Sequence, residues 1–349
     1  MYRKNKVSEK LPRRGAMFRR SIFMRTIIAT LLATFLAFFV STTYGTPIVI
    51  KFAHLGYDDS PKGKMAHRFE ELVERKFPDK VKIEVYPDSQ LAYGNQIVDK
   101  IITGEIEMGA PPLSKFKKYS AKYGIFDMPF LFDGIGAVDK FKKTKEGKSL
   151  LKAMEHRGII GLGYMHYGMK QFSANRPLFS PSDAKGLKFR IMDSAILVAQ
   201  FKALNAIPVK KSLKYVHDAL ERGEIDGQES TWSNMYSRKI HEVQKYITES
   251  NHGYVGYMII TNMKFWNSID PTIRKELRKA LNKAIAFGNQ EAVMNEVLDR
   301  NKIVKAHRAK IMTLEASDKE EWIKYMEPVW HEFDDLIGKD LIDAAHKSN

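Results

Sequence analysis

The sequence predicts an α/β fold with two lobes and a cleft between them. Alternating strand and helix patterns occur twice, between residues 48 and 110 and between residues 159 and 227, and a long helical pattern follows from Pro271. Strands that alternate with helices typically form a parallel sheet covered by helices. The 349 residues are also enough for two domains of ordinary size.

Each unit has its own set of expected elements. In the first unit we expect strands at 48–54, 81–86 and 106–110 and helices at 64–76 and 95–103, from apolar residues at strand or helix spacing. In the second unit we expect strands at 159–167, 187–191 and 225–227 and helices at 194–204 and 215–222. Open α/β sheets bind ligands at the carboxyl ends of their strands. The loops expected to face the cleft therefore follow His54, Ala110, Tyr167 and Ile191.

A long helical pattern begins at Pro271 and continues to about residue 310. Asp270 is a suitable N-cap, and proline is favoured at the first helical position. A helix of this length is far above the average of about 11 residues, and it is long enough to brace both lobes. The alternative is two ordinary helices, because Gly288 is expected to bend or interrupt the pattern.

The first 45 residues differ from the rest. Nine Lys and Arg residues and one acid precede an uncharged run at 26–43, whose apolar centre at 27–40 is shorter than the ~20 residues that span a bilayer. Thr43 and Gly45 are small residues suited to the −3 and −1 positions of a cleavage site. This pattern predicts a signal peptide over residues 1–45, cleaved near Gly45, and a periplasmic protein. An uncleaved membrane anchor is the alternative, and Met17 and Met24 are alternative starts.

Charge and cysteine content exclude several classes of function. The leader accounts for +8 of the formal net charge of +16, so residues 46–349 carry only +8, without a long Lys/Arg run. This is not the pattern of a nucleic-acid-binding protein, but it suits a protein with small anionic ligands. Cysteine is absent, which excludes disulfides, thiol nucleophiles and cysteine-based metal sites.

The common catalytic and cofactor motifs are missing. Gly161 and Gly163 begin a dinucleotide motif, but its third glycine would fall at His166. The sequence also has no Walker loop, no HExxH and no GxSxG. We therefore expect neither an enzyme nor a bound cofactor or metal. An exported hydrolase or lyase would need a nucleophile or acid–base pair that the sequence does not offer.

Three features are candidates for binding an anion. Strand alternation places Lys188 and Arg190 on one face of strand 187–191, where an arginine can hold a carboxylate through two hydrogen bonds; the alternative is an ordinary surface arginine. Lys170 follows an expected strand and is a possible second cation. The polar segment 226–234 either lines a wet pocket or begins a capped helix.

Six motifs occur in the order known from one family. They are 61–63 (PKG), 86–91 (YPDSQL), 126–132 (FDMPFLF), 186–190 (GLKFR), 226–229 (DGQE) and 242–246 (EVQKY). Over residues 48–346 the chain resembles the substrate-binding subunits of TRAP (tripartite ATP-independent periplasmic) transporters, the DctP family. Further stretches resemble its dicarboxylate branch, associated with succinate, fumarate and malate: 168–175, 232–236, 250–254 and 265–267.

The resemblance implies a two-lobed, type II-like periplasmic binding protein with a long lobe-spanning helix. Lobe 1 would comprise residues 46–167, with about 256–297 returning to it, and lobe 2 residues 168–255, with about 298–349. Arg190 would pair with the ligand carboxylate, and Lys170 stands where sialic-acid-binding members have a second arginine. The other implied ligand-binding residues are Leu55, Lys62, Ser230, Trp232 and Asn234. Ser230 replaces an asparagine common in the family, and Pro112 replaces a small polar residue.

The resemblance also implies the function and its partners. We expect a monomeric extracytoplasmic receptor that closes around a small dicarboxylate, the organic dianion that Arg190 and Lys170 would balance. The closed receptor would deliver it to the membrane subunits of a TRAP transporter. The alternatives are a family member that binds another organic acid, such as a keto or sugar acid, and a sensor ectodomain with a retained membrane segment.

Overall fold

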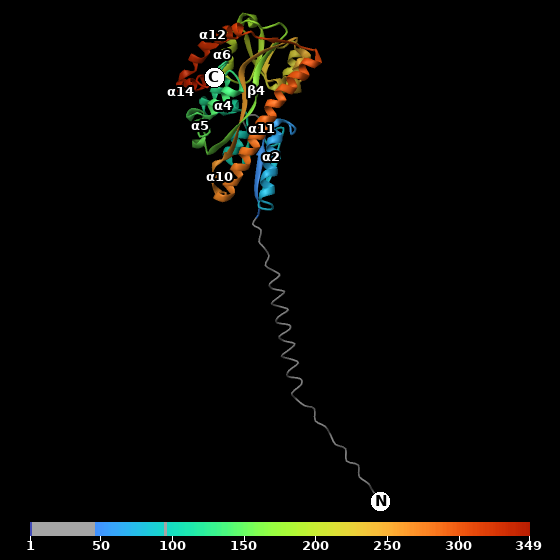
Figure 1. Cartoon of the computed structure of the whole chain (residues 1–349), viewed down its shortest axis with the longest axis vertical. Helices are drawn as coiled ribbons and strands as arrows, with labels where there is room; N and C mark the ends of the chain where they lie inside the picture. The colour runs from blue at the N-terminus through green and yellow to red at the C-terminus, as the bar shows by residue number, and fades with distance from the viewer. Residues whose placement is uncertain (2–45, 94–95) are drawn as a thin grey trace. The chain divides into compact units, whose positions relative to one another are not determined.

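The computed structural model describes Met1 and residues 46–93 and 96–349. Residues 47–349 form one compact unit (Figure 1). The predicted signal peptide and its cleavage site lie outside the described residues, except for Met1. In the described ranges no helix combines the length and apolar character needed to cross a membrane.

One mixed sheet of nine strands runs through the molecule. Its order is β2-β1-β3-β8-β4-β7-β5-β6, and β9 pairs with β8. The strands are β1 (Ile48–Ala53), β2 (Val81–Tyr86), β3 (Met108–Gly109), β4 (Ile159–Ala174), β5 (Lys188–Ile191), β6 (Ile207–Lys210), β7 (Gly227–Ser230), β8 (Tyr246–Asn262) and β9 (Lys310–Thr313). The pairs β1–β2, β1–β3, β5–β6 and β5–β7 are parallel. The predicted α/β grouping is therefore confirmed in both halves of the sheet.

The two longest strands, β4 and β8, join the halves of the sheet. They run antiparallel from the pair Ile159–Asn262 to the pair Ala174–Tyr246 and have three register irregularities. The prediction ended the first of these strands at Tyr167, which is wrong, because pairing with β8 extends it to Ala174. Lys170 consequently lies inside β4 and not in a loop after it.

The long helix is continuous. α11 (Pro271–Ala306) contains 36 residues and is capped by the Asp270 side chain. The expected interruption at Gly288 is wrong, because the helix runs through it. This glycine allows close packing: a Cβ there would lie 2.7 Å from Cβ of Met65 in α2 (Pro61–Lys76). α11 also packs against β4 and against α8 (Trp232–Ser237), so it contacts both halves (Figure 1).

The remaining helices lie between and after these elements in the chain. Those expected from the sequence are α3 (Gln96–Thr103), α6 (Ala195–Ala203) and α7 (Val216–Glu221). The others are α4 (Ile135–Lys143), α5 (Lys145–Leu150), α9 (Ile240–Val243), α10 (Met263–Ser268), α12 (Ala316–Glu332), α13 (Asp334–Ile337) and α14 (Lys339–His346). Five 3-10 helices are η1 (Leu113–Lys118), η2 (Ala121–Asp127), η3 (Glu155–Arg157), η4 (Pro181–Ala184) and η5 (Leu213–Tyr215).

Buried hydrophobic residues form three clusters. One lies around β1, α2 and the first half of α11, and another around α7, α8 and the second half of α11. The largest joins residues from both halves, including Ile97, Phe172 and Trp322. Because α12 packs on α6 while α14 packs on α4 and α5, the C-terminal segment contacts both halves as well. The lobe boundaries stay a prediction.

Candidate ligand-binding site

Arg190 lies near the carboxyl end of β5 and is only 5 % exposed. Its Nε donates to the carbonyl of Lys211 at 2.8 Å. Among the residues that the structure describes, its two terminal nitrogens have no hydrogen-bond acceptor. Burial lowers the pKa of Arg190 to about 10, and nearby Glu229 opposes this shift. The alternative of an ordinary surface arginine is therefore wrong: Arg190 is a buried guanidinium with its fork unused.

Lys170 is paired inside the protein. Its Nζ donates to Oε1 of Glu229 at 2.7 Å, and the other carboxylate oxygen lies 2.8 Å from Nε2 of His252. All three side chains are buried. Burial would raise the pKa of Glu229, but Lys170 and His252 hold it at about 2. Burial lowers the pKa of His252 to about 4, so its ring is neutral at pH 7. The charge of Lys170 is thus already balanced by Glu229.

Lys62 occupies a different environment. It is 2 % exposed in the first turn of α2, and its Nζ lies 3.5 Å from the ring centroid of Tyr257. Burial lowers the pKa of Lys62 to about 7. His54, at the end of β1, is fully buried, and neither ring nitrogen has a hydrogen-bond partner among the described residues. Burial, followed by the charge of Lys62, lowers the pKa of His54 to about 3.

The other predicted ligand-binding residues have different surroundings. Ser230 ends β7 and pairs with Gln171, the neighbour of Lys170. Asn234 Oδ1 accepts from the hydroxyl of Tyr167 at 3.1 Å, and the Tyr167 ring packs edge-on against that of Tyr257. Leu55 is half-buried in the loop after β1.

Trp232 belongs to the hydrophobic cluster around α7 and α8. Its ring lies 5.6 Å from the guanidinium carbon of Arg300, and its backbone N–H donates to Glu296, both residues of α11. The structure therefore brings Arg190, Lys170 and Ser230 onto neighbouring strands. It connects Asn234 to Lys62 through two tyrosines. Trp232 packs in the core and also lines a pocket of about 160 Å³ together with Gln171 and Asn251.

Sequence reasoning missed the partners of these residues. Glu229 and His252 both stand in motifs that were recognised, at 226–229 and 250–254. Yet the two partners of Glu229, Lys170 and His252, lie 59 and 23 positions from it in the sequence. His54 was identified only as the start of a loop that faces the cleft. Tyr257 carried no signal, because an aromatic residue in a strand is ordinary.

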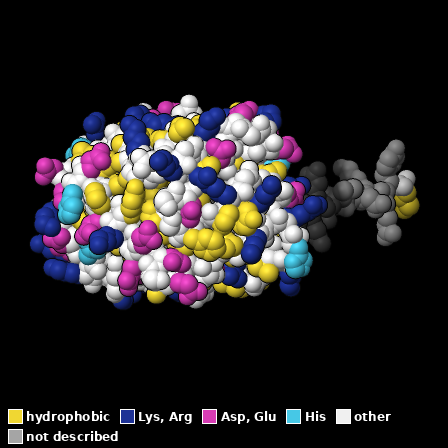
Figure 2. Space-filling view, turned by 90° about the horizontal axis from the view of Figure 1, so that it is seen from above, with side chains coloured by type: hydrophobic (Ala, Val, Ile, Leu, Met, Phe, Trp, Pro, Cys, Tyr) yellow, Lys and Arg dark blue, Asp and Glu magenta, His cyan; other side chains and the backbone are white. Residues whose placement is uncertain are grey.

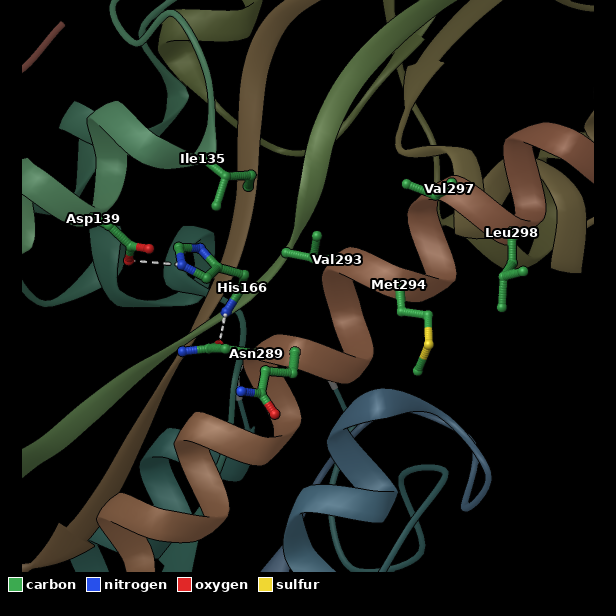
Figure 3. A pocket seen from close by; sticks show the side chains of 9 residues that line it. Ile135, Asp139, His166, Asn289, Val293, Met294, Val297 and Leu298 are labelled. Carbon is green, nitrogen blue, oxygen red and sulfur yellow. Dashed lines mark hydrogen bonds and ion pairs between the residues drawn. The ribbon is translucent and has the colours of Figure 1, made fainter.

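A groove lies between α4, β4 and α11 and has a volume of about 590 Å³ (Figure 3). Ile135, Val293 and Val297 give it apolar walls. Asp139 is the one charged residue among its nine lining residues, and it bonds Nε2 of His166 at 2.8 Å. A groove that offers a carboxylate and no Lys or Arg is unsuited to an organic anion.

Comparison with known proteins identifies the family. The family model DctP, bacterial extracellular solute-binding protein, family 7, matches residues 52–335. The chain belongs to the DctP family. The C4-dicarboxylate-binding periplasmic protein DctP of Shewanella loihica is 44 % identical over 332 residues, which are 95 % of this chain and 97 % of the relative.

Solved structures of TRAP periplasmic solute binding proteins share the fold. A TRAP periplasmic solute binding protein from Shewanella oneidensis with bound succinate is 46 % identical, with a TM-score of 0.83 over 87 % of this chain and 99 % of that one. A TRAP protein from Pseudomonas aeruginosa with bound L-malate is 41 % identical, with a TM-score of 0.78 over 82 % and 100 % of the two chains. The predicted two-lobed fold with a long helix is confirmed.

Proposed function

We propose that this DctP protein is an extracytoplasmic receptor that binds a four-carbon dicarboxylate, such as succinate, fumarate or malate, and delivers it to a TRAP transporter. Support comes from relatives above 40 % identity that are named for C4-dicarboxylates or hold succinate or L-malate. We further propose that it acts in the periplasm as a monomer after loss of residues 1–45, without enzymatic activity. Its partners are the organic dianion and the TRAP membrane subunits.

The single observation that carries this proposal is the state of Arg190. A buried guanidinium whose terminal nitrogens are unused is suited to a planar, bidentate contact with a carboxylate. The hydrogen bond from Nε to Lys211 fixes the orientation of the fork before the ligand arrives. Nucleic acid is an unsuitable partner, because acidic and basic side chains are interspersed on the face in Figure 2.

Lobe closure would couple binding to transport. We propose lobes at the predicted boundaries, with β4, β8 and α11 passing between them. Closure expels water and strengthens the contact between Arg190 and the carboxylate, so the ligand favours the closed state. The closed receptor would then dock on the membrane subunits.

A thermal-shift screen tests the substrate class, because a ligand specific to the native state raises the melting temperature. We expect a rise with succinate, fumarate or malate and none with butyrate at equal concentration. A rise only with a sugar acid or keto acid would contradict the dicarboxylate assignment and favour the alternative within the family.

The same proposal predicts the effect of replacing Arg190. The variant Arg190→Ala should bind diacids more than tenfold more weakly, since losing one partner of a buried charge pair costs about 2–5 kcal/mol. Arg222→Ala, on an exposed side chain, is the control. Calorimetric titration that finds equal affinities for Arg190→Ala and wild type would remove Arg190 from the site.

A further inference from the structure

We propose that the groove between α4, β4 and α11 is a second binding site, which takes a straight-chain aliphatic cation such as an alkylammonium ion. The aliphatic chain lies against Val293 and Val297 of α11, and the ammonium group binds the carboxylate of Asp139 in α4. This inference goes beyond the proposed receptor function and does not depend on it, because no residue named for the dicarboxylate lines the groove.

Two helices and a strand form the walls of the groove. Ile135 and Asp139 stand four residues apart on α4, and so do Val293 and Val297 on α11. Each pair therefore shares one face of its helix, and His166 of β4 lies between the two helices (Figure 3). The volume of about 590 Å³ is within the range of small-molecule sites, about 300–1,000 Å³. Apolar walls and a carboxylate thus face the same space, as a cation with an apolar tail requires.

The apolar side chains of α11 are exposed where they border the groove. Four of them on two consecutive turns are between 47 % and 58 % exposed: Val293, Met294, Val297 and Leu298. Single exposed apolar residues are ordinary, but a contiguous patch beside a groove indicates a surface that another molecule covers. An aliphatic chain in the groove would remove part of this patch from water.

Asp139 supplies the charge that selects a cation. Its Oδ1 accepts a hydrogen bond from Nε2 of His166 at 2.8 Å, whereas Oδ2 has no donor among the described residues. Burial would raise the pKa of Asp139, but the hydrogen bond from His166 and the charges of nearby lysines lower it, so the carboxylate is ionised at neutral pH. The side chain is 49 % exposed, and an ammonium group can therefore reach it.

The groups around Asp139 leave much of its charge unbalanced. Burial lowers the pKa of His166, so its ring is neutral at pH 7. Lys142 donates to the hydroxyl of Tyr254 at 3.1 Å and stays 3.9 Å from Oδ1 of Asp139, too far for a hydrogen bond. Burial lowers the pKa of Lys142 to about 7, so it carries only part of a charge at neutral pH. A bound cation would complete the balance.

The dimensions of the groove favour a slender ligand over a protein segment. An α-helix with its side chains is about 10 Å across, so one turn fills about 400 Å³, and the groove would hold little more than one turn. An aliphatic chain needs only a narrow channel, and the groove continues past Val293 and Val297 into the smaller pocket beside Trp232. A neutral apolar molecule would cover Asp139 and leave its charge unpaired, which is unfavourable.

The test compares octylammonium with 1-octanol, which have the same chain and differ in charge. Calorimetric titration should show that wild type binds octylammonium at least tenfold more tightly than octanol. Asp139→Asn keeps the shape of the side chain and should lose this preference, while its affinity for octanol stays within threefold of wild type. Asp133→Asn, on an exposed side chain before α4, is the matched control and should behave as wild type. Equal octylammonium affinities of wild type and Asp139→Asn would overturn the proposal.

A second variant tests the apolar wall. Val297→Ser should weaken octylammonium and octanol binding equally, each by threefold or more, because both ligands lose the same apolar contact. Val304→Ser is the matched control, since Val304 is 42 % exposed on the same helix but does not line the groove. If the two serine variants bind octylammonium alike, the chain does not lie along this part of α11 and the site is wrong.

Other occupants of the groove would give different results. If octylammonium does not bind, but wild type forms a dimer in sedimentation that Val297→Ser weakens, the groove is an interface between two copies of the chain. If octylammonium does not bind, but Val297→Ser weakens docking on reconstituted TRAP membrane subunits, the groove is a surface for a protein partner. Either result overturns the cation site.

Discussion

Two groups of buried charged residues differ in whether the protein itself supplies a counter-charge for the lysine. In the Lys170–Glu229–His252 group, the carboxylate contacts both the lysine and the histidine within 2.8 Å. In the Lys62–His54 group, the cation faces an aromatic ring, and neither ring nitrogen of the histidine forms a hydrogen bond of ordinary geometry with a described residue. The first group is balanced without a ligand and can act as a rigid wall. The second has no ion-pair partner for its lysine among the described residues, so we predict that an entering anion would balance it.

Removing the carboxylate from the Lys170–Glu229–His252 group should have the largest effect on stability. Glu229→Gln leaves Lys170 buried without a counter-charge, and we expect the free energy of unfolding to fall by about 3–5 kcal/mol. Urea denaturation measures this difference. The exposed Glu224→Gln is the control. A loss below 1 kcal/mol would show that Lys170 does not depend on Glu229.

Low pH should also destabilise the protein through the Lys170–Glu229–His252 group. The pKa of folded His252 is about 4, below its ordinary value of 6.5, so its contribution to stability is fully present above pH 6.5. It is lost as pH falls from 6.5 to 4, because over this interval the histidine binds a proton in the unfolded chain but not yet in the folded protein. We expect wild type to lose on the order of 1–3 kcal/mol more than His252→Gln over this interval. Urea denaturation at pH 7 and pH 4.5 measures this loss. If wild type and His252→Gln lose the same free energy of unfolding between the two pH values, the assignment is contradicted.

Replacing the uncompensated cation should stabilise the ligand-free protein. The pKa of folded Lys62 is about 7, below the ordinary 10.5, so its penalty is full below pH 7 and disappears above pH 10.5. Lys62→Met should therefore raise the free energy of unfolding by about 1–3 kcal/mol at pH 7, and by less at pH 9. Lys80→Met should leave it unchanged. A destabilised Lys62→Met would mean that the lysine is already compensated without ligand.

The smallest expected effect concerns the packing that positions α2. Gly288→Ala places a Cβ 2.7 Å from Cβ of Met65, and we expect a loss of about 1–2 kcal/mol from overpacking. This loss should outweigh the gain of about 1 kcal/mol from replacing a helical glycine. Gly136→Ala in α4, where a new Cβ meets nothing within 4 Å, is the matched control and should stabilise. Equal behaviour of the two variants in thermal unfolding would contradict close packing at Gly288.

Local features of the fold could be predicted because their causes are local. Strand β2 alternates apolar and charged residues and was predicted with its exact bounds. The start of α11 followed from Asp270 and Pro271, whose capping geometry involves only the next few residues. Arg190 could be identified as a candidate anion ligand, because its place near a strand end is a property of the local pattern.

Features that depend on distant partners could not be predicted. The end of β4 moved from Tyr167 to Ala174 because β8, about 80 residues later, supplies the hydrogen bonds. Gly288 was interpreted by its helix propensity, yet its function is contact with Met65, more than 200 residues away. Helix propensity depends on the residue type alone, whereas the space available for a side chain depends on which residue packs against it.

The sequence by itself determined the family, the α/β elements and the candidate role of Arg190, because motifs, periodicity and capping are written in consecutive residues. Only the tertiary structure decided which cations are compensated. Lys170 and Lys62 look alike in sequence, but Glu229 lies 2.7 Å from one, while the other lies over Tyr257. The free energy of a buried charge depends on its nearest neighbours in space, and those neighbours are set by the packing of strands far apart in the chain.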